Sequence, residues 1–164
     1  MPTVSVSAEP WAAPDGAALR NAQELELNSR YGADDHEPGT APSSANVPVF
    51  LVARTADGTA VACGGLRPLA REVAGENTAE IKRMYASPAA RGTGAAVAVL
   101  HALEGAAREL QLTRLVLETG TLQPDAIRFY EREGYHPIPQ YGPYVGEETS
   151  VCFAKSLGEH GEFA

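Results

Sequence analysis

Apolar residues recur along this chain with two periods, one typical of strands and one typical of helices. Short apolar runs bounded by Gly, Pro or polar turn residues predict strands at 3–7, 47–54, 60–69, 78–86, 113–119 and 149–155. Longer segments with apolar residues three or four positions apart predict helices at 15–29, 94–110 and 124–133. The resulting order, β-α-β-β-β-α-β-α-β, indicates an α/β fold with a mixed central sheet flanked by helices.

Turn residues between these segments indicate how the strands connect. The segment 55–59 carries the dipeptide Asp57-Gly58 between two apolar runs, which predicts a β-hairpin. A polar connection at 71–77 leads to the third consecutive strand and completes an antiparallel meander. The segment 31–46 is rich in Gly, Pro, Asp and Ser and has no period, so we expect a long loop that is either functional or disordered.

Length and composition indicate one domain spanning 1–164, with its core at about 47–156. A chain of 164 residues with 44% apolar and 21% charged residues can bury a sizeable core without disulfides. Cys63 and Cys152 both lie within apolar runs, which is typical of small buried thiols in a reducing compartment. The sequence has no membrane-length apolar run and no basic leader followed by an apolar segment, so we expect a cytoplasmic protein.

The net charge limits the classes of partner. With 13 Lys and Arg against 21 Asp and Glu, the chain carries −8 at neutral pH. This balance argues against binding to nucleic acid or to an anionic membrane surface. It is compatible with an amine or a basic peptide as substrate.

A glycine-rich turn, RGTGAA, occupies Arg91–Ala96 between a predicted strand and a predicted helix. Gly92 and Gly94 let the backbone approach a ligand closely. The first amides of a helix have no partner within the helix, and the positive end of the helix dipole lies behind them. The turn therefore predicts a site for a diphosphate, to which Arg91 can add a charge-assisted hydrogen bond.

Two other phosphate-binding turns compete with this interpretation. A Walker A loop requires Gly-Lys-Ser/Thr, whereas Gly94 is followed by two alanines, which excludes that loop. A dinucleotide-binding turn is compatible with Gly92 and Gly94, and Glu118 would then bind the ribose of NAD. Val97 stands where that turn needs its third glycine, so an NAD-dependent oxidoreductase is a remote alternative.

A second motif, IRFYEREGY, follows at Ile127–Tyr135. Gly134 suits the position just after a helix, and Tyr135 can pack back onto that helix. Taken together, Arg-x-x-Gly-x-Ala in the turn and Tyr-x-x-x-Gly-aromatic from Tyr130 resemble the GNAT superfamily of acyl-CoA-dependent N-acetyltransferases. The resemblance is strongest over 78–135, and the segments GPY and SVCFAK resemble a bacterial branch of that superfamily.

The resemblance implies where acetyl-CoA binds. In the superfamily the pantetheine arm runs between two diverging parallel strands, which correspond here to 78–86 and 113–119. The backbone that pairs with the pantetheine amides corresponds to Met84, Tyr85 and Ala86. The amides that bind the diphosphate correspond to those of Arg91, Gly92, Thr93, Gly94, Ala95 and Ala96. Gln123 replaces an asparagine that often contacts the cofactor, and the resemblance implies no metal.

The resemblance also implies direct attack of a neutral amine on the thioester. Tyr130 would lie near the sulfur and protonate the departing CoA thiolate, because a phenol with a pKa near 10 can serve a thiol with a pKa near 8.5. A backbone N–H of the strand 78–86 would bind the developing oxyanion. Glu80 and Glu118 are candidate bases for an amine that arrives as ammonium, although each could instead pair with Lys82 or Arg83.

We therefore expect an N-acetyltransferase that uses acetyl-CoA and a small-molecule or peptide amine. A non-catalytic CoA-binding or sensory module on the same fold is the alternative from another class. The acceptor stays open, because Arg67, Lys82 and Arg83 would suit a carboxylate whereas the acidic chain suits a cation. The resemblance also allows a homodimer formed through the last strands.

Overall fold

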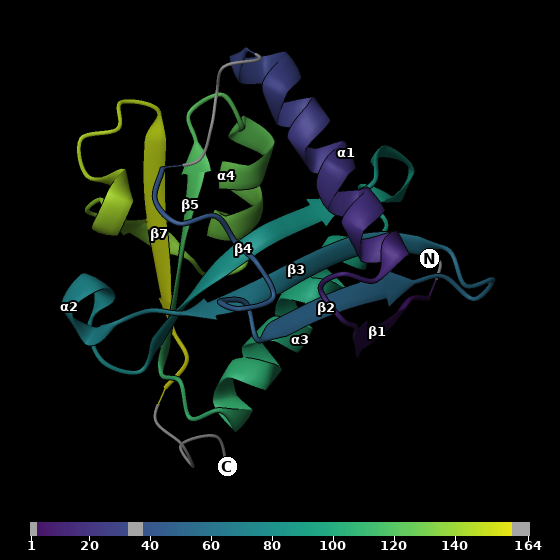
Figure 1. The fold of residues 1–164 in the computed structure, drawn as a ribbon, viewed down its shortest axis with the longest axis horizontal. Coiled ribbons are helices and arrows are strands. Elements are labelled where there is room, and N and C mark those ends of the chain that lie inside the picture. Colours follow the sequence, from purple (N-terminus) through teal and green to yellow (C-terminus); the bar gives the residue numbers. More distant parts are fainter. Residues whose placement is uncertain (1–2, 33–37, 159–164) are drawn as a thin grey trace. The chain divides into compact units, whose positions relative to one another are not determined.

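A computed structural model describes residues 3–32 and 38–158 of the chain (Figure 1). The strands are β1 (Ser5–Ala8), β2 (Val49–Arg54), β3 (Ala60–Pro68), β4 (Thr78–Ala86), β5 (Arg114–Gly120), β6 (His136–Ile138) and β7 (Ser150–Ser156). The α-helices are α1 (Pro14–Tyr31), α2 (Arg71–Ala74), α3 (Ala95–Glu109) and α4 (Pro124–Arg132). Two short 3-10 helices are η1 (Pro88–Ala90) and η2 (Gly142–Tyr144).

Hydrogen bonds order the strands of the sheet as β1-β2-β3-β4-β5-β7-β6. The pairs β1–β2, β2–β3, β5–β7 and β6–β7 are antiparallel, whereas β4 and β5 are parallel with Glu80 opposite Val116. A parallel pair needs a long crossover between its strands, and α3 provides it. The mixed sheet and its helices confirm the predicted α/β class.

The described residues pack as two compact units, and β4 runs from the second unit into the first. The first unit contains 3–32, 42–67 and 81–106. The second contains 38–41, 68–80 and 107–158. The single domain expected from the length stays a prediction.

In the first unit, helices cover both faces of β2 and β3. On one face, α1 packs with a cluster of buried side chains, namely Leu19, Phe50, Val52, Cys63 and Tyr85. On the other face, Gly64 makes room for α3, since a Cβ at this position would lie 2.6 Å from Met84 Sδ and 3.0 Å from Leu103 Cδ1. Cys63 and Gly64 are consecutive in β3, so they face opposite sides of the sheet.

In the second unit, β7 lies between β5 and β6 and completes the sheet around a tyrosine-rich core. That core contains Val116, Tyr141, Tyr144, Cys152 and Ala154. Val116 on β5 and Cys152 on β7 belong to strands that pair antiparallel, with Cys152 opposite Glu118. This face of the sheet therefore carries both apolar and carboxylate side chains.

Most predicted elements agree with the structure to within about two residues at each end. The exceptions are short: α2 occupies part of the predicted connection 71–77, and β6 and η2 lie in a segment expected to be turns. A strand of three residues containing Pro137 is too short to produce a periodic signal. In the predicted loop 31–46, residues 33–37 lie outside the described residues, and Val47 N–H closes a turn on Ser43 O at 2.9 Å.

Candidate functional site

The glycine-rich turn has a backbone that suits an anion. Gly92 and Gly94 have φ angles of +78° and +92°, a left-handed conformation that glycine adopts without strain. The helix α3 begins directly after them, and Ala98 N–H donates to Gly94 O at 3.0 Å. The amides of Ala95 and Ala96, in the first turn of α3, therefore have no acceptor within the helix. This arrangement fits the diphosphate of a nucleotide.

The Arg91 side chain is bonded within the protein. Its Nη2 donates to both carboxylate oxygens of Glu26 on α1, at 2.8 and 3.0 Å. Its Nε donates to Ala86 O at 3.0 Å, and its Cζ lies 5.5 Å from the centre of the Tyr85 ring. The role of Arg91 as a phosphate ligand stays a prediction, and its ion pair with Glu26 was not predicted.

The end of β4 carries a strained residue beside the predicted pantetheine-binding backbone. Arg83 has a φ of +58°, a left-handed conformation that costs a non-glycine residue about 1–3 kcal/mol and interrupts a regular strand. The next residue, Met84, accepts a hydrogen bond on its carbonyl from Gln23 Nε2 of α1 at 2.9 Å. Strained residues of this kind concentrate at functional sites. The strain at Arg83 has no signal in the sequence.

Tyr130 is positioned by the C-terminal end of α4. Gly134, with a φ of +94°, donates to Glu131 O at 3.2 Å, and Tyr135 N–H donates to Tyr130 O at 2.9 Å. These two bonds form a Schellman motif, which confirms the helix end predicted from Gly134. The rings of Tyr130 and Tyr135 lie 5.7 Å apart, edge to face. Burial raises the pKa of Tyr130 above its ordinary value, so its phenol stays protonated.

Glu80 lies in a buried network with two tyrosines. Glu80 is 1% exposed. Its Oε2 accepts hydrogen bonds from the hydroxyls of Tyr141 and Tyr144, each at 2.7 Å. Burial raises the pKa of Tyr141, and the neighbouring Glu80 charge raises it further, so this phenol remains a donor. Sequence reasoning missed both tyrosines as site residues, although the segment GPY contains one of them.

Glu118 occupies a more open place on the same face of the sheet. Glu80 is opposite Val116, and Glu118 follows Val116 by two residues, so the two carboxylates project from one face. Glu118 is half-buried and accepts a hydrogen bond from Ser150 Oγ at 2.7 Å. The second unit thus brings the two predicted bases to one face and gives them different surroundings.

Gln123 lies at the N-terminal end of α4. Its N–H donates to Gly120 O at 3.0 Å, and its carbonyl accepts from Ile127 N–H at 3.1 Å. Its side chain makes no capping hydrogen bond to the helix. The predicted cofactor contact of Gln123 stays a prediction.

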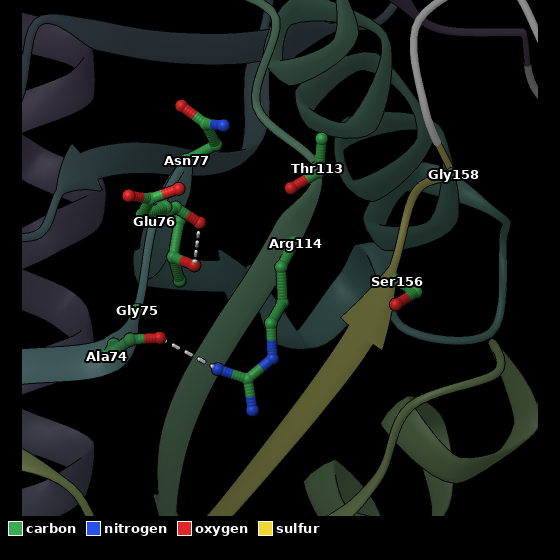
Figure 2. A pocket seen from close by; sticks show the side chains of 9 residues that line it. Ala74, Gly75, Glu76, Asn77, Thr113, Arg114, Ser156 and Gly158 are labelled. Atoms are coloured by element: carbon green, nitrogen blue, oxygen red, sulfur yellow. Dashed lines mark hydrogen bonds between the residues drawn. The ribbon is translucent and has the colours of Figure 1, made fainter. Parts of the chain in front are cut away.

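A cavity of about 540 Å³ lies in the second unit, at the N-terminal ends of β4 and β5 (Figure 2). Its lining includes Glu76, Asn77, Arg114 and Ser156, and Arg114 Nη1 donates to Ala74 O at 3.0 Å. The lining residues include none of the predicted site residues. Glu76 and Arg114 give the lining charges of both signs, and Glu76 also pairs with Arg71, 3.3 Å away and outside the lining.

Two kinds of feature are absent from the part of the chain that the structure describes. No three His, Cys, Asp or Glu side chains in residues 3–32 and 38–158 are grouped as a metal site requires. Within the same residues, no helix combines the length and apolar character needed to cross a membrane.

Related sequences extend over almost the whole chain. The model of the acetyltransferase (GNAT) family matches residues 17–135, which include both the glycine-rich turn and the Tyr130–Tyr135 motif. The chain is 32% identical over 160 residues to an IAA acetyltransferase from Azospirillum brasilense, covering 96% of this chain and 100% of that protein.

Related structures share the fold over a similar length. A protein from Klebsiella pneumoniae assigned as an acyl-CoA N-acyltransferase has a TM-score of 0.78 at 28% identity, over 94% of this chain and 98% of that one. The PaiA N-acetyltransferase of Thermoplasma acidophilum, solved in complex with coenzyme A, has a TM-score of 0.66 at 15% identity, over 93% and 99%.

Proposed function

The chain belongs to the acetyltransferase (GNAT) family, and from that premise we propose how its residues hold acetyl-CoA and transfer the acetyl group. It is an acyl-CoA-dependent N-acetyltransferase, and proteins of this family act on amine acceptors. One observation carries the assignment of residues. Both family motifs have the local structure that their roles require, a glycine turn opening α3 and a Schellman ending that fixes Tyr130.

The turn residues 91–96 are proposed to bind the diphosphate of acetyl-CoA. The left-handed Gly92 and Gly94 and the free first-turn amides of Ala95 and Ala96 support this role. The backbone of Met84, Tyr85 and Ala86 is proposed to pair with the pantetheine amides. Acetyl-CoA, as the co-substrate, supplies a thioester carbonyl that is reactive toward nitrogen.

Tyr130 is proposed as the proton donor to the leaving group. The neutral amine nitrogen bonds to the thioester carbonyl carbon, the carbon–sulfur bond breaks, and the thiolate takes the Tyr130 hydroxyl proton. The proton that the nitrogen loses as the amide forms then restores the Tyr130 phenol. A backbone N–H of β4 is proposed to bind the developing oxyanion. Because burial raises the pKa of Tyr130, its phenol is protonated at neutral pH, as a proton donor must be.

Glu80 and Glu118 are proposed as the candidate bases that take the proton from an ammonium acceptor. Glu80 is held by Tyr141 and Tyr144, so a proton can reach it through a phenol. Glu118 is half-buried and can exchange a proton through water. Their shared face supports the idea that one of them faces the acceptor.

The acceptor is proposed to be a primary amine on a small molecule or peptide. The relative from Azospirillum brasilense carries the name IAA acetyltransferase, so a panel of candidate acceptors for activity assays should contain IAA beside amines.

A cytoplasmic location is proposed because both cysteines are buried free thiols. A homodimer through the last strands is likewise a proposal.

A thermal-shift titration with acetyl-CoA, CoA and NADH side by side tests the cofactor. A ligand at a hundred times its dissociation constant adds about 2.7 kcal/mol, which raises the melting temperature by several degrees. A rise with both CoA forms and none with NADH supports the proposal. A rise with NADH alone would instead favour the oxidoreductase. CoA binding without turnover of any acceptor in the panel would favour the sensory module.

A further inference from the structure

One face of α1 contacts two groups that the proposed function assigns to CoA. Glu26 forms a two-oxygen ion pair with Arg91, the cation of the proposed diphosphate turn. One turn earlier, Gln23 Nε2 donates at 2.9 Å to the carbonyl of Met84, part of the proposed pantetheine-binding backbone. Both contacts lie within the first unit.

The ion pair of Arg91 and Glu26 conflicts with a diphosphate at the same arginine. Arg91 Nη2 is shared by the two Glu26 oxygens, and its Nε is taken by Ala86 O. The side chains of Arg91 and Glu26 are 41% and 30% exposed, so their charges are only partly screened by water. A diphosphate bound to Arg91 would place negative charge beside the Glu26 carboxylate. The two anions therefore compete for one cation.

The remaining polar contacts of α1 in this region are incomplete. Within the described residues, Gln23 Oε1 and Arg20 Nη1 are buried and have no hydrogen-bond partner. Buried polar atoms in native proteins nearly always have one. Other polar contacts hold the start of α1, including an ion pair of Asp15 with Arg54 at 2.9 Å and a hydrogen bond from Arg20 Nη2 to Trp11 O at 2.7 Å. Further along the helix, the Glu26 carboxylate contacts the proposed diphosphate turn through Arg91.

We propose that Glu26 is a built-in competitor for Arg91, and that the diphosphate of CoA binds by displacing the Glu26 carboxylate. No covalent bond changes in this exchange, and the ion pair re-forms when CoA leaves. Glu26 thereby weakens CoA binding and speeds CoA release. This role rests on the proposed function, because it requires CoA at the glycine-rich turn.

The test compares E26Q with E24Q in the full chain. Glu24 is exposed on the same helix, so E24Q removes the same charge without touching Arg91. Calorimetry and stopped-flow measurements at fixed salt give the dissociation constant and the release rate of CoA. We expect E26Q to bind CoA about three- to tenfold more tightly and to release it more slowly, and E24Q to stay within about twofold of wild type.

Two further measurements show whether the effect acts through Arg91. In an R91Q background, E26Q should change CoA affinity by less than about twofold, because the contested cation is gone. Pantetheine, which lacks the diphosphate, should bind wild type and E26Q equally. Equal effects of E24Q and E26Q, or weaker CoA binding by E26Q, overturn the competitor role while CoA binding by wild type stands. Absence of CoA binding by wild type overturns both this role and the proposed function.

Discussion

At the scale of single residues, burial distinguishes the hydroxyl and carboxyl groups of the candidate site. Tyr130 is buried and its pKa is raised, so it is always protonated in the range where the enzyme would work. A raised pKa also makes the phenol a weaker acid, so its contribution depends on close placement rather than on acidity. Glu80 and Glu118 differ in burial and in partners, since Glu80 is fully buried and accepts from two phenols whereas Glu118 is half-buried and accepts from a serine hydroxyl.

Tyr130→Phe should lower kcat about a hundredfold or more and leave the dissociation constant of CoA within about twofold. The substitution removes only the hydroxyl and keeps the ring contact with Tyr135. Because the pKa of Tyr130 lies above its ordinary value, wild-type kcat should show no alkaline loss near pH 10 from this group. Steady-state kinetics from pH 7 to 10 and CoA calorimetry measure both effects. An unchanged kcat would remove Tyr130 from the chemistry.

Glu80→Gln and Glu118→Gln separate the two candidate bases. We expect E118Q to leave the free energy of unfolding within about 0.5 kcal/mol, because the side chain is half-buried. We expect E80Q to lower it by about 1–3 kcal/mol, because two buried phenols lose their shared charged acceptor. The variant that also loses the acidic limb of the kcat/KM profile identifies the base. A profile unchanged in both variants would show that neither carboxylate has this role.

At the scale of elements, the approach of α3 to β3 depends on the absence of a side chain at Gly64. A Cβ there would meet three side chains closely, Met84 Sδ at 2.6 Å, Leu103 Cδ1 at 3.0 Å and Val99 Cγ1 at 3.2 Å. The same helix begins directly after the glycine-rich turn. Close packing of α3 on the sheet is therefore linked to the position of the proposed diphosphate site.

Gly64→Ala should lower the free energy of unfolding by about 1–3 kcal/mol, because the added methyl group overpacks the β3–α3 interface. Gly105→Ala on α3 is the matched control, since a Cβ there meets no atom within 4 Å. In a helix that change should stabilise by roughly 0.5–1 kcal/mol. Urea unfolding of the two variants measures the difference. Equal effects at the two positions would contradict the packing described for Gly64.

At the scale of the whole molecule, both cysteines are buried thiols, one in each unit. Burial raises the pKa of Cys63 to about 12 and that of Cys152 to about 11. In the unfolded chain both thiols ionise near pH 8.5. The folded state therefore binds more protons than the unfolded state above that pH.

The free energy of unfolding should fall as pH rises above about 8.5, by about 1.4 kcal/mol per pH unit for each thiol. Below that pH the thiols are protonated in both states and contribute no slope. Denaturant midpoints from pH 7 to 10 measure this dependence, with Cys63→Ala/Cys152→Ala as the variant that should show a shallower decline. A thiol reagent at pH 8 should label both cysteines only after unfolding. Fast labelling of the native protein would contradict their burial.

The sequence by itself determined the features that depend on neighbouring residues. The Asp57-Gly58 hairpin, the glycine turn before α3 and the Schellman ending at Gly134 all appear as predicted. Turn and cap chemistry acts over a few residues, so a single sequence contains all of its information. For the same reason the order of the long strands and helices could be predicted, and with it the fold class.

Only the tertiary structure decided which distant side chains meet. Tyr141 and Tyr144 bind Glu80 although they are 61 and 64 residues away from it in the sequence. Glu26 pairs with Arg91 although the two are 65 residues apart. The left-handed Arg83 likewise depends on the sheet around it, because nothing in its own sequence favours that conformation. Such pairings follow from how the strands and helices pack. Local sequence patterns report on neighbouring residues, so they do not indicate which distant side chains meet.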